Sequence, residues 1–261
     1  METIPTFETL LWNQDGPILT ITLNRPEILN AFNAGMLRDI EIAVGKMPAM
    51  HDVRVVVFTG AGRAFCSGAD LTTVSEFHSE VEGDAIAQGI RQAQGVFDSI
   101  ETLEKPTIAA MNGHAVGAGL QLALACDIRL AVSGAKLGLS DVKIGIVPAL
   151  GATTRLPKLI GLAKTKELIL TGDLISAEEA LEIGLVSRVV DAESFGATVK
   201  ELAEKLGSRA PLAVAAVKRL LNSGASLNDV ASAQSHLIKS ADALEGVSAF
   251  LERRAPTFTG T

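Results

Sequence analysis

Two glycine-rich loops in the sequence can bring backbone N–H groups close to a ligand. One spans residues 62–70 after an apolar run, and the other spans residues 113–119 before an apolar run with helical character. N–H groups in the first turn of a helix have no intrahelical partner, and glycine allows a ligand to approach them. Two such loops can direct two N–H groups at one oxygen, an oxyanion hole worth about 3 kcal/mol per donor. The alternative interpretation is that these glycines only serve tight turns.

An amide and an acid are the polar side chains of interest near these loops. Gln121 is the one polar residue in the apolar stretch 118–126, and Asp141 follows 20 residues later. A glutamine amide donates and accepts hydrogen bonds but takes no proton at neutral pH. A carboxylate in an apolar pocket has a raised pKa and can act as a base. The structural alternative for Asp141 is an N-cap or turn residue.

Hydrophobic periodicity predicts the elements that must position these residues. The first half alternates strands with helices, and the last quarter is helical throughout, which is typical of an α/β chain with a helical C-terminal region. Strands are expected at 17–24, 53–60, 105–113, 127–132 and 184–190, and a loop at 61–71. Helices are expected at 33–47 with Asn33 as N-cap, and at 84–102, 117–126, 151–160, 162–170, 177–183, 195–207, 211–223, 227–240 and 241–252. We divide the chain into a core, 1–200, and a C-terminal region, 201–261.

Composition limits the classes of function. The chain has 261 residues, 48% of them hydrophobic, which suits a large core, and its formal net charge of −7 argues against nucleic acid as a ligand. Cys66 and Cys126 lie in apolar surroundings and are expected to be buried free thiols. No metal-ligand spacing, signal peptide or membrane-spanning run is found in the sequence. We therefore expect a cytoplasmic protein that does not bind membranes.

Four segments resemble the enoyl-CoA hydratase/isomerase (crotonase) family in order and spacing. They are AFCSGADL, KPTIAAMNGHAVGAGLQLALACDIRLA, GIVPALGATTRLPKLIG and GVSAFLERRAPTF. The resemblance implies a crotonase-type spiral of ββα units with a C-terminal helical trimerisation region. It also implies a homotrimer or dimer of trimers, an acyl-CoA thioester as substrate, and no metal or redox cofactor.

The resemblance also assigns site residues by position. The oxyanion hole would be formed by the N–H groups of Ala69 and Ala118. Phe250 and Arg253 match a C-terminal helix that closes the coenzyme A site, often from a neighbouring subunit. The remaining expected substrate and coenzyme A contacts are Ile28, Leu29, Ala31, Ser67, Gly68, Asp70, Leu71 and Gly117. Of these, Asp70 is also expected to hold its own loop.

The family's hydratases use two glutamates, and this chain has neither. Gln121 occupies the first position and Asp141 the second, so one carboxylate is left beside the oxyanion hole. This favours isomerisation of a 3-enoyl to a 2-enoyl thioester with Asp141 as the single base. The alternatives are a 2-enoyl-CoA hydratase in which Gln121 orients a water, and a non-catalytic acyl-CoA-binding protein.

Three further features concern the surroundings of the site. Acyl-chain specificity is expected to depend on the loop from about Thr72 to Ile90. His114 lies in the second glycine loop, where its imidazole either takes part in the reaction or caps a strand end. Asp127 is expected to be structural, at a junction between helix and strand.

Overall fold

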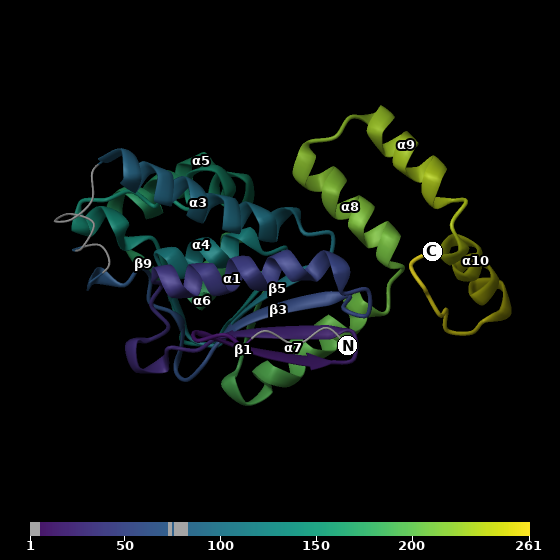
Figure 1. Cartoon of the computed structure of the whole chain (residues 1–261), viewed down its shortest axis with the longest axis horizontal. Helices are drawn as coiled ribbons and strands as arrows, with labels where there is room; N and C mark the ends of the chain where they lie inside the picture. The colour runs from purple at the N-terminus through teal and green to yellow at the C-terminus, as the bar shows by residue number, and fades with distance from the viewer. Residues whose placement is uncertain (1–5, 73–74, 76–82) are drawn as a thin grey trace.

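A computed structural model of the protein describes residues 6–72, 75 and 83–261 (Figure 1). Its strands form two sheets. The larger sheet has the order β1 (Leu10–Asp15), β2 (Ile18–Leu23), β3 (Val55–Gly60), β5 (Thr107–Met111), β7 (Ile128–Val132) and β10 (Arg188–Val190). The smaller sheet has the order β4 (Ala64–Cys66), β6 (His114–Val116), β8 (Lys136–Gly138) and β9 (Leu174–Ser176).

From β3 to β8, consecutive strands alternate between the two sheets. Strands β3, β5 and β7 pair in parallel in the larger sheet, while β4, β6 and β8 pair in parallel in the smaller one. Each strand pair leads into a helix, so the chain advances by one strand in both sheets at every turn. This is the spiral of ββα units that the resemblance implies.

Helices cover both faces of the larger sheet. In Figure 1, α1, α3 and α4 lie on one side of β3 and β5, and α7 lies on the other. The helices are α1 (Ala34–Lys46), α3 (Gly83–Thr102), α4 (Ala118–Ala125), α5 (Ala152–Thr171), α6 (Ala177–Glu182), α7 (Ala192–Gly207), α8 (Pro211–Ser223), α9 (Leu227–Leu237) and α10 (Ala241–Glu252). Short 3-10 helices are η1 (Pro26–Ile28), η2 (Met47–Ala49) and η3 (Ser140–Ile144).

Strand β3 shows why its apolar run is continuous. Val55 and Val57 belong to the core cluster that includes α7, whereas Val56 and Phe58 belong to the cluster under α1, α3 and α4. Successive side chains of a strand point to opposite faces, so a strand covered on both sides needs apolar residues throughout. The prediction of a strand buried on both faces is confirmed.

The long elements agree with the sequence-based predictions, and the short strands do not. Helices α8 and α10 have the predicted bounds, the Asn33 side chain caps α1, and Gly161 breaks the helical geometry of α5 between the two predicted segments. The expected loop at 61–71 is wrong in part, because β4 lies within it. Strand β1, which has six residues and lies in the larger sheet, was not predicted, and neither were the three-residue strands β6, β8 and β9 of the smaller sheet. A strand of three residues is too short for an alternating pattern to show.

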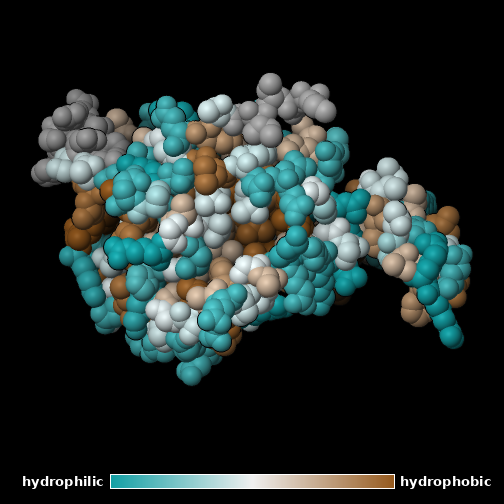
Figure 2. Space-filling model, turned by 90° about the horizontal axis from the view of Figure 1, so that it is seen from below, coloured by the Kyte–Doolittle hydropathy of each residue, from teal (hydrophilic) through white to brown (hydrophobic). Residues whose placement is uncertain are grey.

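Helices α8, α9 and α10 form an arm that projects from the body (Figure 1). The division at residue 200 falls inside α7, whose Val199 and Leu202 pack into the core. The arm therefore begins at α8. Figure 2 shows hydrophobic residues on the surface of the arm. Large exposed apolar side chains of the arm include Leu221, Leu227, Ile238, Leu244, Val247, Phe250 and Leu251.

Candidate active site

The two glycine-rich loops meet in the structure. A side chain at Gly68 would stand 3.2 Å from the Val116 oxygen and 3.8 Å from the Gly117 Cα. Two residues after Gly117, a side chain at Gly119 would lie 2.6 Å from Cβ of Cys66, closer than packed atoms allow. Glycine is therefore required for α4 to approach β4 so closely. The approach places the start of α4 beside the loop that follows β4.

Two backbone N–H groups at this junction have no hydrogen-bond partner within the part of the chain that the structure describes. The N–H of Ala118 is the first of α4, and the N–H of Ala69 lies beside the single bridge to Phe32. Neither donates a hydrogen bond to any residue that the structure describes. The preceding N–H of Gly117 does have a partner, the Gly138 oxygen at 2.9 Å. Both groups assigned by resemblance thus have no hydrogen-bond partner among the described residues.

Asp141 lies against the same junction. It is in η3, and a side chain at Gly117 would stand 3.6 Å from its Oδ2 and 3.9 Å from its Oδ1. Oδ2 is buried and has no hydrogen-bond partner among the described residues. Burial raises the pKa of the Asp141 carboxyl, which its own backbone N–H partly offsets. A buried acceptor without a partner costs free energy, so its retention points to a ligand or a proton-transfer role.

The Gln121 side chain is fully buried in the first turn of α4, and its carbonyl oxygen accepts hydrogen bonds from backbone N–H groups. Its Oε1 accepts hydrogen bonds from the N–H groups of Leu150 at 2.7 Å and Ala152 at 3.4 Å. Its Nε2 donates to none of the described residues. The acceptor of the amide is thus occupied, and the amide can offer a ligand only its N–H groups.

The expected coenzyme A segment lies beside the loop after β4. The Ser67 N–H donates to the Leu29 oxygen at 3.0 Å, and the Ser67 hydroxyl donates to the Ile28 oxygen at 3.3 Å. Ile28 is partly exposed, whereas Ala31 is buried. The structure therefore joins the two expected contact segments into one surface, which also includes the exposed Leu71.

Asn30 holds this surface together and was missed in the sequence. Its side chain is fully buried, accepts from the Arg25 N–H, and donates to the oxygens of Ala61 and Ala64 at 2.9 Å. Its φ of 57° is left-handed, a conformation that asparagine tolerates better than most residues. The Asn–Ala pair after an apolar strand carries no pattern that identifies such a role.

The acids and the histidine considered for structural roles have structural partners. Asp70 forms an ion pair with Arg25 at 3.2 Å and accepts from Thr72, and these contacts lower its pKa. The Nδ1 of His114 accepts the Lys136 N–H at 2.9 Å, which caps the adjacent strand. Asp127 accepts from the N–H and hydroxyl of Thr107 and pairs with Lys218 at 2.8 Å.

Phe250 and Arg253 are on the arm. Phe250 is 83% exposed in α10, and Arg253 ends that helix with a left-handed φ of 55°. Helix α10 lies at the far end of the arm (Figure 1), so the chain does not bring these two residues to its own Asp141. Residues 73–74 and 76–82 of the expected specificity loop lie outside the described residues, and residues 83–90 begin α3.

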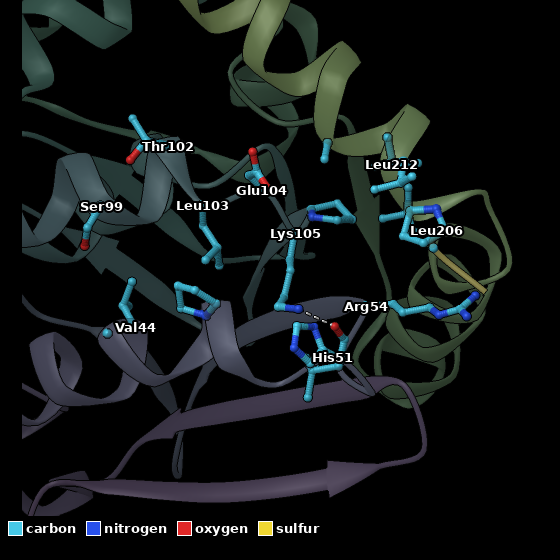
Figure 3. A pocket seen from close by; sticks show the side chains of 18 of the residues that line it. Val44, His51, Arg54, Ser99, Thr102, Leu103, Glu104, Lys105, Leu206 and Leu212 are labelled. Carbon is cyan, nitrogen blue, oxygen red and sulfur yellow. Dashed lines mark hydrogen bonds between the residues drawn. The ribbon is translucent and has the colours of Figure 1, made fainter. Parts of the chain in front are cut away.

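A separate cavity of about 930 Å³ lies between α1, α3 and the start of the arm (Figure 3). Lys105 extends into it and donates to the oxygens of Met50 at 2.9 Å and Val53 at 2.7 Å. Burial lowers the pKa of this lysine. Neither Asp141 nor Gln121 lines the cavity. Both cysteines are buried free thiols, as predicted, and burial raises the pKa of each to about 12.

Comparisons with known proteins identify the family. The enoyl-CoA hydratase/isomerase family profile matches residues 13–261. A short-chain-enoyl-CoA hydratase from Clostridium acetobutylicum is 38% identical over 252 residues, 94% of this chain and 95% of that protein. A crotonyl-CoA hydratase from Syntrophomonas wolfei is 36% identical, over 97% of this chain and 98% of that protein. A crystal structure of an enoyl-CoA hydratase from Bacillus anthracis superimposes with a TM-score of 0.92 at 35% identity, covering 97% and 100% of the two chains.

The fold is therefore the crotonase fold, with a helical C-terminal region. The chain belongs to the enoyl-CoA hydratase/isomerase family, and it is an enzyme of that family. Within the described ranges, no helix is both long and apolar enough to cross a bilayer. The same ranges contain no group of three or more histidine, cysteine or acidic side chains placed to hold a metal ion.

Proposed function

We propose that the protein isomerises a 3-enoyl-CoA thioester to the 2-enoyl-CoA thioester with Asp141 as the single acid–base group. The observation that carries this proposal is the buried Oδ2 of Asp141, which has no partner among the described residues and lies beside Gly117. The N–H groups of Ala69 and Ala118, which donate to no described residue, belong to the two loops that meet in space at Gly68 and Gly117. A base beside two oxyanion donors suits the transfer of a proton next to a thioester carbonyl.

The proposed reaction has two proton transfers. The Asp141 carboxylate removes a proton from C2, and the electron pair of that C–H bond moves onto the thioester oxygen. The Ala69 and Ala118 N–H groups stabilise this oxyanion. The Asp141 carboxylic acid then returns the proton to C4, the double bond moves from C3–C4 to C2–C3, and the thioester carbonyl forms again. No water or cofactor enters the balance.

Gln121 supports isomerisation over hydration. A water that attacks a double bond must give a proton to a base and keep a lone pair free. The Oε1 of Gln121 already accepts two backbone N–H groups, and an amide takes no proton at neutral pH. The Nε2 can donate a hydrogen bond to one lone pair of a water and so orient it, but it cannot take the proton that the water must lose on attack. Gln121 thus cannot replace a carboxylate as the base.

Hydration of a 2-enoyl-CoA thioester is the second candidate. The relatives in Clostridium acetobutylicum and Syntrophomonas wolfei are named hydratases, which favours this reaction. In this chain Asp141 would then activate the water and deliver the proton to C2 alone. Aspartate is shorter than glutamate by one methylene, and a misplacement of about 1 Å can cost about 10²-fold in rate.

Two substrates followed in parallel distinguish the reactions. The absorbance of the conjugated thioester is recorded with 3-hexenoyl-CoA and with 2-butenoyl-CoA. A rise with the first and no change with the second is the expected result. A fall with the second and no change with the first would replace isomerisation by hydration. Binding of both thioesters without any change would support a non-catalytic acyl-CoA-binding protein.

We further propose that coenzyme A lies along the joined surface of residues 28–31 and 67–71. Both segments border the oxyanion donors, and their mutual hydrogen bonds hold them in place. Phe250 and Arg253 would reach this surface from a second copy of the chain, because α10 stands away from the body. The exposed apolar side chains of the arm support a homotrimer or a dimer of trimers.

A further inference from the structure

The turn at residues 149–152 is held by side chains from three helices. Gln94 of α3 donates to the Ala149 oxygen at 2.7 Å. Gln121 of α4 accepts the Leu150 N–H at 2.7 Å, and Nη1 of Arg155 in α5 donates to the Leu150 oxygen at 3.0 Å. Most loops bind their backbone groups to water or to neighbouring backbone. This turn instead depends on a set of buried or half-buried polar side chains.

Arg155 is the centre of this set. It is 5% exposed, and its guanidinium pairs with Asp98 and, at 2.8 Å, with Glu101 of α3. A buried arginine is rare unless it is paired, so these acids fix its position. Gly151 has a φ of 100°, and a side chain there would collide with Nη1 of Arg155. The turn and the arginine are thus fitted to each other.

The same turn ends the segment that carries Asp141. At the end of η3, the Ile146 N–H donates to the backbone carbonyl oxygen of Asp141 at 3.2 Å. The chain then continues directly into the turn. The Asp141 Oδ2 has no hydrogen bond to any described residue. The backbone of its segment therefore has to place the carboxylate, with little help from side-chain contacts.

We propose that Arg155, Gln121 and Gln94 are positioning residues that fix the Asp141 carboxylate against Gly117 by clamping the turn at 149–152. This inference rests on the proposed function in one respect, the role of Asp141 as the base. Because a displacement of about 1 Å can cost about 10²-fold in rate, release of the turn should lower turnover strongly and substrate binding little.

The test uses Arg155→Met in the full-length protein, with Gln94→Met as a milder variant that removes one hydrogen bond. Lys218→Met is the matched control, since Lys218 is also buried and paired, with Asp127, but does not contact the turn. The rate measured is the exchange of α-protons of butanoyl-CoA for deuterium in D2O, which reports on the base and the oxyanion hole without a double bond. Isomerisation of 3-hexenoyl-CoA is measured beside it.

The expected result is a fall of about 10²-fold in the maximal exchange rate of Arg155→Met per folded protein, with KM changed less than about threefold. Gln94→Met should lose about threefold, and Lys218→Met should keep the wild-type rate despite its lower thermal stability. In addition, the acid limb of the pH–rate profile should move to lower pH in Arg155→Met. The Asp141 carboxylate, once it is no longer held in place, becomes better hydrated, and hydration lowers its pKa. A role in stability alone would not move that limb.

Wild-type exchange rates in both Arg155→Met and Gln94→Met would overturn the clamp and leave the proposed function intact. Exchange by the wild type without isomerisation, still lost in Arg155→Met, would overturn the isomerase and leave the clamp. A wild type that exchanges no α-proton would overturn both, since no base would then act at C2.

Discussion

The Asp141 carboxylate lies beside Gly117, at the point where the chain turns into α4. Its Oδ2 would be 3.6 Å from a Cβ at residue 117, and Gly117 has a φ of 51°. The next residue, Ala118, gives the first N–H of α4. Glycine at 117 therefore allows the left-handed turn into the helix, and this turn brings the N–H of Ala118 next to the residue that the Asp141 carboxylate contacts.

Asp141→Asn should abolish proton transfer and stabilise the fold at neutral pH. Burial raises the pKa of Asp141 in the folded state, so the folded protein holds this proton more tightly than the unfolded chain does. The free energy of unfolding of the wild type therefore falls as pH rises through the folded pKa. Asparagine has no charge to bury, so the variant should melt at a higher temperature at pH 7.

Thermal melts of both proteins between pH 7 and pH 4 check this expectation. The difference should shrink as the pH falls toward about 3.9, where aspartate is protonated in the unfolded state too. A variant that is less stable than the wild type at pH 7 would show that the charged carboxylate has a partner in the folded protein. Retained turnover would exclude Asp141 as the base.

Ala118→Pro should remove one oxyanion donor with little damage to the fold. Ala118 is the first residue of α4, where proline is tolerated because its nitrogen needs no intrahelical partner. The maximal rate should fall by about 10²- to 10³-fold, the effect of losing one such donor in other enzymes. Ala118→Gly keeps the N–H and is the control. Equal rates in the two variants would show that this N–H does not contact the substrate oxygen.

Gln121→Glu should add a base while it keeps the turn. A carboxylate oxygen can accept the Leu150 and Ala152 N–H groups as the amide does, and the second oxygen can take a proton from water. Hydration of 2-butenoyl-CoA should rise by about 10²-fold, the range of general base catalysis. Gln121→Met, which has neither group, should lower every activity. A glutamate variant with no gain in hydration would mean that residue 121 does not reach the water site.

The sequence predicted the long elements because the signals for them are local. The helix at 211–223 begins at a proline and ends before Gly224, and the apolar run of β3 shows double-sided burial directly. The two glycine loops were also evident, as was the change from acid to amide at residue 121.

The contacts that hold the site could not be predicted, because they join distant segments. Gln94, Asp98 and Glu101 lie on one face of α3, a spacing that is visible in the sequence but looks like an ordinary solvated face. Gln94 donates to the Ala149 oxygen, 55 residues away, and Arg155, the partner of Asp98 and Glu101, is 54 residues from Glu101. Only the structure shows that the two acids of α3 pair with Arg155 of α5, and that Arg155 and Gln94 bind the turn after Asp141.

The arm gives the last prediction. Leu244, Val247 and Leu251 are 70%, 60% and 75% exposed and follow one face of α10. An apolar stripe on an amphipathic helix is stable in water when another surface covers it. The protein should therefore have a mass in light scattering of about three or six times its 27.2 kDa. The double variant Leu244→Glu/Leu251→Glu should dissociate, because it places two charges in that contact.

Dissociation should also weaken coenzyme A binding, since Phe250 and Arg253 are proposed to reach the site of a neighbouring copy. KM for the thioester should rise in the double variant, while the exchange rate at saturation changes less, because Asp141, Ala69 and Ala118 belong to one chain. Leu11→Gln, which changes an exposed leucine of β1, is the control for added polarity. A double variant that dissociates and keeps the wild-type KM would place the coenzyme A site within a single copy of the chain.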